Sequence, residues 1–350
     1  MVNIHKIIEH ALSKNASDIH LMLDEKPIYR VGAALVKMQE STALKIEDMD
    51  KIHELFAKGN PQNTVDVKYE YKGTNFEVNL SSANKSPICT LKVLKHELPE
   101  YEELGLPDVL RNATHQSQGL ILVAGNKKSG KTTTLNALVR HINETQNKKI
   151  ITLEKNIEYK HNLRNSVIIQ KQIGVDFFTY QEGVKNALKE DCDILIVEDI
   201  RNKETMETIF EIVEAGGLVI AGINTTTYEK VKEKIINFYD EKEQTRIKYL
   251  LSEFLKLVIS QKLLLGTKGK LELLSEVTVP QNNKKNISLI NSLANLYVKN
   301  KITLKQAKSQ IEEKDIDELN TIIMKKRIQW QNTKFQDAWK KGYIWKLELI

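Results

Sequence analysis

The stretch from Gly125 to Thr132 constrains the fold of this chain more than any other feature of its sequence. It reads G-N-K-K-S-G-K-T and fits the pattern G-x-x-x-x-G-K-[ST] of a phosphate-binding loop. The apolar run Leu120–Val123 precedes the loop as a buried strand would, and residues 133–139 read as the first turns of a helix. A strand, this loop and a helix in that order predict an α/β domain that binds a nucleotide through its phosphates.

Two positions in the loop have specific expected roles. The ammonium group of Lys131 would contact the β- and γ-phosphates, and the hydroxyl of Thr132 would hold Mg²⁺. The backbone N–H groups of the loop, together with the N-terminus of the following helix, would surround the phosphates. The predicted nucleotide-binding residues of this segment are Gly125, Asn126, Lys127, Lys128, Ser129, Gly130, Lys131, Thr132 and Thr133.

The composition is that of an ordinary soluble globular protein. The chain has 350 residues, of which 41% are hydrophobic and 28% charged. No run approaches eighteen apolar residues and the N-terminus lacks the apolar core of a signal peptide, so we expect neither membrane insertion nor secretion. Two widely separated cysteines suit a reducing cytosol. The net charge of +6 alone does not indicate a nucleic-acid partner.

Two hydrophobic patterns divide the chain. Through residue 97, short alternating runs predict antiparallel strands at 18–23, 27–31, 34–38, 64–71 and 75–80, with helices at 3–13 and 46–58. The Pro- and Gly-containing segment 98–108 reads as a linker. In residues 109–275, helices separate strand candidates at 120–124, 149–153, 166–169, 194–198 and 218–223, which predicts a mostly parallel, doubly wound sheet.

The remaining residues, 276–350, read as a helical extension. A hairpin is expected just before it, around Gly266 and Gly269. The segment from Asp315 to Ile350 contains all three tryptophans in a Lys-rich helical pattern. That pattern suits either a docking helix or an amphipathic helix packed on its own domain.

Several motifs follow one another along the chain. They are A-S-D-I-H at residues 16–20, E-E-L-G-L-P at 102–107, I-T-L-E-K-N-I-E-Y-K-H at 151–161, Q-K-Q-I-G-V-D at 170–176, D-I-L-I-V-E-D-I-R at 193–201 and V-I-S-Q-K-L-L at 258–264. In this order they resemble motifs of type IV pilus retraction ATPases, the PilT/PilU group of secretion ATPases. The first is similar to the N-terminal signature of that family, the third to its Asp box, the fifth to its Walker B segment and the last to a later helix.

The resemblance implies a hexameric ring ATPase that uses ATP and Mg²⁺ on the cytoplasmic face of the inner membrane. Each subunit would combine a PAS-like N-terminal domain with a RecA-like ATPase domain. The ring would be a homo-hexamer or a mixed hexamer with a related ATPase, and it would act on a pilus platform protein of the inner membrane. Glu154 and Asp199 would be the catalytic carboxylates, Thr132 and Asp199 the metal-binding residues, and Arg201 a further nucleotide-binding residue.

The chain departs from the family pattern near the expected site. Lys128 replaces a glycine, which would strain the loop if that position needs a positive φ. The Gly-Glu pair of Walker B is Glu198-Asp199. Glu198 could take over the role of the family's glutamate, but alternation along the strand predicts that it faces away from the site, which favours Asp199. Asn224 stands where the family has a histidine, and an amide cannot carry a proton as an imidazole can.

Three functions remain open on the sequence. The first is an ATP-hydrolysing motor subunit, most consistent with retraction and twitching motility. The second is an accessory subunit that binds nucleotide, hydrolyses it slowly or not at all, and assembles with a competent motor. The third is a RecA-like nucleic-acid motor, although no segment interleaves basic and aromatic residues as a strand-binding channel does, so no nucleic acid is expected.

Overall fold

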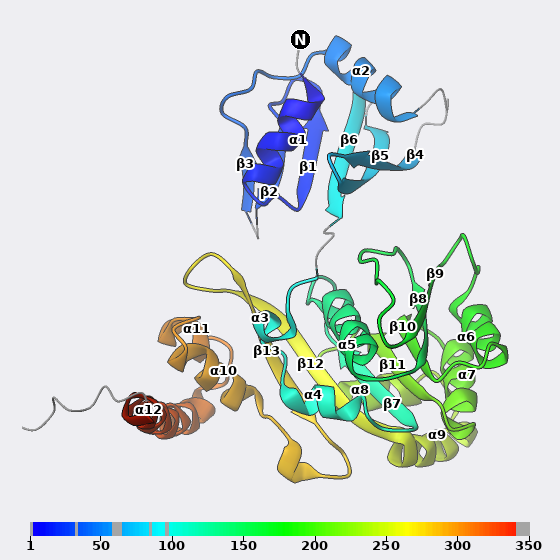
Figure 1. Cartoon of the computed structure of the whole chain (residues 1–350), viewed down its shortest axis with the longest axis vertical. Helices are drawn as coiled ribbons and strands as arrows, with labels where there is room; N and C mark the ends of the chain where they lie inside the picture. The colour runs from blue at the N-terminus through cyan, green and yellow to red at the C-terminus, as the bar shows by residue number, and fades with distance from the viewer. Residues whose placement is uncertain (1–2, 32–33, 58–64, 84–85, 95–97, 341–350) are drawn as a thin grey trace, which may run out of the picture. The chain divides into compact units, whose positions relative to one another are not determined.

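The computed structural model describes residues 3–31, 34–57, 65–83, 86–94 and 98–340 (Figure 1). These residues form two compact units. The first comprises Met1–Leu98 with Glu158–Lys160, and the second comprises Pro99–Ile157 with His161–Ile350. Each unit has its own sheet and its own hydrophobic core.

The first unit is an antiparallel sheet of six strands with two helices, α1 (Ile4–Ser13) and α2 (Ile46–Ala57). The Asn3 side chain caps α1 by accepting a hydrogen bond from the N–H of His5. Both helices agree with the prediction. The strand order is β3-β2-β1-β6-β5-β4. The strands are β1 (Asp18–Met22), β2 (Ile28–Val31), β3 (Ala34–Lys37), β4 (Val65–Tyr71), β5 (Thr74–Ala83) and β6 (Ser86–Leu94).

Strand β6 is absent from the sequence-based expectation, yet it occupies a central position between β1 and β5. Its residues are mixed, with Pro87 near its start and Lys92 near its end, so neither alternation nor a continuous apolar run is conspicuous. Pairing with β1 and β5 on both sides selects the extended conformation there.

The second unit contains a seven-stranded sheet with the order β13-β12-β7-β11-β10-β8-β9. All neighbouring pairs are parallel except β12 and β13. The fully buried strand β7 leads into the loop at Gly125–Gly130 and lies between β11 and β12. The strands are β7 (Gly119–Ala124), β8 (Lys149–Glu154), β9 (Val167–Gln172), β10 (Ile194–Ile200), β11 (Leu218–Ile223), β12 (Leu255–Leu265) and β13 (Leu271–Thr278).

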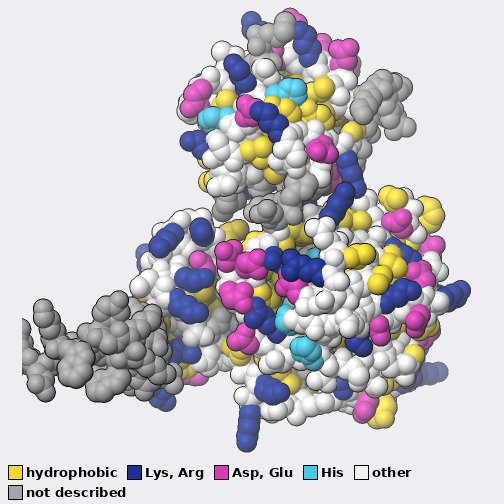
Figure 2. Space-filling model, viewed as in Figure 1, with side chains coloured by type: hydrophobic (Ala, Val, Ile, Leu, Met, Phe, Trp, Pro, Cys, Tyr) yellow, Lys and Arg dark blue, Asp and Glu magenta, His cyan; other side chains and the backbone are white. Residues whose placement is uncertain are grey.

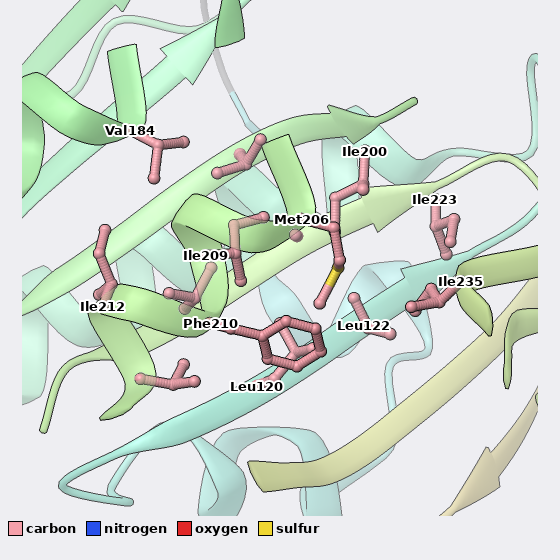
Figure 3. Packing of buried hydrophobic residues seen from close by; sticks show 14 of the residues in the cluster. Leu120, Leu122, Val184, Ile200, Met206, Ile209, Phe210, Ile212, Ile223 and Ile235 are labelled. Carbon is pink, nitrogen blue, oxygen red and sulfur yellow. The ribbon is translucent and has the colours of Figure 1, made fainter. Parts of the chain in front are cut away.

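Helices cover both faces of this sheet. On one face, apolar side chains of α6 (Tyr180–Lys189), α7 (Lys203–Glu214), α8 (Tyr228–Ile236) and α9 (Glu241–Phe254) share a core with alternate strand residues. Figure 3 shows Met206, Ile209 and Phe210 of α7 among the strand residues Leu120 and Leu122. On the other face lies α5 (Lys131–Thr145), which begins at the end of the loop.

The structure corrects the interpretation of Val258–Leu264. This segment was expected to be helical, and it lies instead within β12, paired with both β7 and β13. A continuous apolar run suits a doubly buried strand as well as a buried helix, and the sequence pattern alone does not separate them. The hairpin expected around Gly266 and Gly269 is the connection between β12 and β13.

The segment expected to be a linker contains a single helical turn, α3 (Tyr101–Leu104), followed by α4 (Asp108–Ala113). Toward the C-terminus, α10 (Leu289–Val298), α11 (Leu304–Lys308) and α12 (Ile316–Lys340) form a small core with Leu274 of β13. Two short 3₁₀ turns lie in this region: Asn283–Lys285 between β13 and α10, and Glu313–Asp315 between α11 and α12. The side chains of Trp330, Trp339 and Trp345 lie outside the described part, so the docking helix stays a prediction. Among the described helices, none has the length and apolar character that crossing a bilayer requires.

Candidate nucleotide-binding site

The loop between β7 and α5 has the backbone that its glycines allow. Gly130 precedes α5 with φ +90°, and Lys128 has φ +65°, in the left-handed region. Position 128 therefore does need a positive φ, and it is occupied by lysine, which has a Cβ. The strain expected from the replacement of glycine is present. A left-handed conformation costs a residue other than glycine about 1–2 kcal/mol. Asn126, Lys127 and Lys128 are exposed at the tip of the loop.

Close packing fixes the base of the loop. A Cβ on Gly125 would lie 2.2 Å from Oγ of Ser129 and 2.6 Å from the carbonyl oxygen of Gln261, so only glycine fits. Ser129 is 5% exposed, and its Oγ has no hydrogen-bond partner among the described residues. An orphaned polar atom inside a loop of this backbone fits a site that receives a polar ligand.

The side chain of Lys131 lies back across the loop. Its Nζ donates to the carbonyl oxygens of Gly125 at 2.6 Å and Asn126 at 3.0 Å. Burial lowers the pKa of Lys131, while the carboxylates of Asp199 and Glu198 act in the opposite direction. The two carbonyl oxygens therefore hold the ammonium group against the loop backbone. The carboxylates of Asp199 and Glu198 in β10 lie within electrostatic range of it. Thr132 and Thr133 follow in the first turn of α5 and are half-buried.

Gln261 of β12 is hydrogen-bonded to the loop and to the first turn of α5. Its Nε2 donates to the carbonyl oxygen of Ser129 at 2.8 Å, and its Oε1 accepts from Oγ1 of Thr134 at 3.0 Å. Gln261 is 5% exposed, so these hydrogen bonds replace water for a buried amide. We did not assign it a role from the sequence. The sequence does contain a signal for it, because Gln261 is a lone amide within an apolar run. A buried amide needs polar partners.

Glu154, at the end of β8, is 4% exposed. Its Oε1 accepts hydrogen bonds from Oγ1 of Thr152 at 2.6 Å and from Nε2 of Gln170 at 3.0 Å. Glu154 lines a small pocket together with Thr132 of the loop, Glu198 of β10 and apolar residues of α5. The pocket has about 10 Å³ of space, which is close to what a single water needs. The structure therefore brings together Glu154 and Thr132, both named from the sequence.

A second polar chain connects the Asp box with the loop. Nε2 of His161 lies 2.7 Å from Oδ1 of Asn136, and Nδ2 of Asn136 donates to the carbonyl oxygen of Thr132 at 3.0 Å. Because Asn136 uses its amide nitrogen on Thr132, its oxygen accepts, and Nε2 of His161 must carry the proton. Burial lowers the pKa of His161 to about 4, so the ring is neutral at pH 7. Asn136 was not singled out from the sequence.

Strand β10 does not keep regular alternation through Walker B. Val197 pairs with Ala221 and Ile200 with Ile223, so Glu198 and Asp199 together lie opposite Gly222 alone. This is a β-bulge. Glu198 lines the pocket with Thr132 and Glu154, so the expectation that it faces away from the site is wrong.

Asp199 and Arg201 form a pair at the end of β10. Nε of Arg201 donates to Oδ2 of Asp199 at 2.7 Å, and this hydrogen bond raises the pKa of Arg201. Oδ1 of Asp199 is buried and accepts no hydrogen bond from the described residues. Asp199 therefore lies in electrostatic range of Lys131 but is engaged by its own neighbour.

Asn224 follows β11, where the family has a histidine, and is exposed. Its carbonyl oxygen accepts a hydrogen bond from Nζ of Lys234, a residue of α8, at 2.9 Å. The charge of Lys234 contributes to the lowered pKa of Lys131. The structure thus places an additional cation near the loop that the sequence did not indicate.

Comparison with known proteins agrees with this architecture. The family model described as Type II/IV secretion system protein matches residues 1–284. The type IV pilus retraction ATPase PilT of Pseudomonas aeruginosa is 26% identical over 302 residues, 85% of this chain and 88% of that protein. A twitching motility protein of Neisseria gonorrhoeae is 31% identical over 206 residues, 58% of this chain and 55% of that protein.

Among solved structures, the pilus retraction motor PilT with bound ADP superposes with a TM-score of 0.80 at 29% identity, covering 91% of this chain and all of that one. The ATPase DotB of Legionella pneumophila has a TM-score of 0.79 at 21% identity, covering 87% of this chain and 94% of that chain, and so shares the fold. The predicted fold class, an N-terminal α+β domain followed by an α/β ATPase domain, is confirmed. So is the predicted resemblance to pilus retraction ATPases, and the chain belongs to the Type II/IV secretion system protein family.

Proposed function

We propose that this chain is an ATP-binding and ATP-hydrolysing motor subunit of a type IV pilus or related secretion machine, of the retraction type. The observation that carries the proposal is the pocket in which Thr132 of the phosphate loop meets Glu154. Glu154 is buried and oriented by Thr152 and Gln170, as a group that positions a reacting water must be. The similarity to PilT over most of both chains supports the motor role.

The residues of the loop fit ATP with Mg²⁺. The backbone of Gly125–Gly130 and the start of α5 would hold the phosphates, and Lys131 would exchange its two carbonyl partners for phosphate oxygens. Thr132 would hold Mg²⁺, and the ion would supply positive charge beside the phosphates. Glu154 would orient the attacking water, and Arg201 would contribute positive charge near the phosphates.

A second candidate is an accessory subunit that binds nucleotide but hydrolyses it poorly. It is favoured by the pairing of Asp199 with Arg201 and by the strained backbone at Lys128. Asp199 is also one methylene shorter than the glutamate of the family pattern, and a displacement of about 1 Å at a reacting group can cost roughly a hundredfold in rate. In either role we propose a homo-hexamer or a mixed ring with a related ATPase, acting on a platform protein at the cytoplasmic face of the inner membrane.

ATP turnover by the purified chain, compared with its affinity for a fluorescent ATP analogue, separates the two candidates. Lys131→Ala should lose nucleotide binding by at least about tenfold, because a charge-assisted contact to phosphate is removed. Lys185→Ala, an exposed lysine of α6, serves as a matched control that removes the same charge elsewhere. Turnover that exceeds the Lys131→Ala background supports the motor. Tight binding without such turnover refutes the motor and supports the accessory subunit.

The nucleic-acid motor receives no support from the visible surface. On the face of the second unit drawn in Figure 2, Lys and Arg side chains alternate with Asp and Glu, and no continuous basic stripe crosses that face. Ion pairs such as Arg111–Glu102 and Arg140–Glu100 neutralise several of the cations in the second unit. Stimulation of ATP turnover by single-stranded DNA or RNA would nevertheless favour this third function.

A further inference from the structure

The two acidic residues of Walker B lie at a bulge in β10, and Glu198 is the one that lines the pocket with Thr132. Before the bulge, Leu195 and Val197 belong to the core shared with α6 and α7, while Ile196 lies on the opposite face and lines the pocket with α5 residues. Glu198 continues the series of Ile196. Its side chain therefore emerges on the α5 face, where the loop and Thr132 are found.

After Glu198 the alternation of side chains between the two faces of the sheet shifts by one residue. In a regular strand Ile200 would share the α5 face with Ile196, but it lies in the α7 core beside Met206 (Figure 3). The extra residue that shifts it is accommodated opposite Gly222. A Cβ on Gly222 would lie 2.0 Å from the carbonyl oxygen of Glu198, so the bulge depends on the absence of a side chain there.

Hydrogen bonds hold the two carboxylates in different places. Oε2 of Glu198 accepts the backbone N–H of Lys155, the residue after Glu154, which keeps the Glu198 side chain beside the Asp box. Oδ2 of Asp199 accepts from Arg201 instead. The two acidic residues of Walker B therefore have different neighbours. Glu198 lies in the pocket with Thr132 and Glu154, and Asp199 is hydrogen-bonded to Arg201.

We propose that Glu198, rather than Asp199, is the β10 carboxylate that holds the Mg²⁺ of a bound nucleotide opposite Thr132, and that Asp199 positions Arg201. In P-loop ATPases the ion is held by the loop hydroxyl and a carboxylate at the end of the Walker B strand, and Glu198 is the β10 carboxylate that shares a pocket with Thr132. This inference rests on the proposed nucleotide-binding function. No group of three or more His, Cys, Asp or Glu in the described ranges could bind a metal alone, so the ion would bind only together with phosphates.

The test uses the full-length chain and a fluorescent ADP analogue, with Mg²⁺ titrated from zero in the presence of a chelator. The variants are Glu198→Gln, Asp199→Asn and Glu198→Asp, the last of which keeps the carboxylate. The readouts are the Mg²⁺ concentration at half-maximal nucleotide binding and the nucleotide affinity without Mg²⁺. Neither readout depends on turnover, so the test applies equally to a motor and to an accessory subunit.

We expect Glu198→Gln to raise the half-maximal Mg²⁺ concentration about tenfold or more, with Glu198→Asp recovering part of that loss and the affinity without Mg²⁺ unchanged. Asp199→Asn should have the smaller effect. A shift for Asp199→Asn that equals or exceeds that for Glu198→Gln overturns the inference while leaving the proposed function intact. Absence of nucleotide binding by the unaltered chain overturns both. If Glu198→Gln does not fold, the comparison between Glu198→Asp and Asp199→Asn decides in the same way.

Discussion

The half-buried histidine that is hydrogen-bonded to Asn136 should make the second unit sensitive to acid. His161 donates from Nε2 to Asn136, which in turn donates to the carbonyl oxygen of Thr132. Burial, with a smaller contribution from the charge of Arg140, lowers the pKa of His161 to about 4 from its ordinary 6.5. Between these two pH values the unfolded chain binds a proton that the folded chain does not. Stability is therefore lost as the pH falls from 6.5 toward 4, and His161 has no such effect above that range.

The magnitude follows from the two pKa values. The full difference between 6.5 and about 4 corresponds to about 3 kcal/mol, and by pH 5 about 2 kcal/mol should already be lost relative to pH 8. In His161→Gln the side chain no longer titrates, while its amide can still donate to Oδ1 of Asn136. The free energy of unfolding of this variant should therefore fall by about 2 kcal/mol less between pH 8 and pH 5 than that of the unaltered chain.

Urea unfolding followed by circular dichroism at pH 8, 6.5 and 5 measures this difference for both proteins. The titration of the His161 ring, followed by NMR, gives the pKa directly. An identical pH dependence of stability in the two proteins would refute the reasoning. So would a His161 ring that titrates near 6.5 in the folded chain.

Three further changes test the packing around the loop. Gln261→Ala should destabilise the second unit by about 2–4 kcal/mol in urea unfolding, since the carbonyl of Ser129 and the hydroxyl of Thr134 lose a buried partner; a loss below about 0.5 kcal/mol would contradict that role. Gly222→Ala should cost more than about 3 kcal/mol, because its Cβ would clash with backbone; an unchanged melting temperature would exclude the bulge. Lys128→Gly should stabilise by up to about 1 kcal/mol by relieving the positive φ, and destabilisation would contradict it.

The layered architecture was predictable because it depends on local patterns. The helices at 3–13 and 46–58 and five of the six parallel strands carry hydrophobic patterns that agree with their burial. The run at 258–264 shows where this reasoning ends. It carries the same apolar signal as a helix, and its strand conformation is selected by pairing with β7 and β13, which are distant in sequence. Strand β6 was missed for the same reason, since its neighbours β1 and β5 decide its conformation.

The sequence by itself determined that this chain has the pattern G-x-x-x-x-G-K-T between a buried strand and a helix, because the spacing of Gly125, Gly130 and Lys131 is a local property. It also indicated the family and named Glu154 as a candidate catalytic residue. Only the tertiary structure decided that Ile196 and Glu198 face α5 and the pocket of Thr132, and that the parity of β10 changes between Glu198 and Ile200. The bulge that changes the parity depends on Gly222 of the neighbouring strand and on the packing of Ile200. Such a shift is set by contacts between strands, and alternation read along one strand does not contain it.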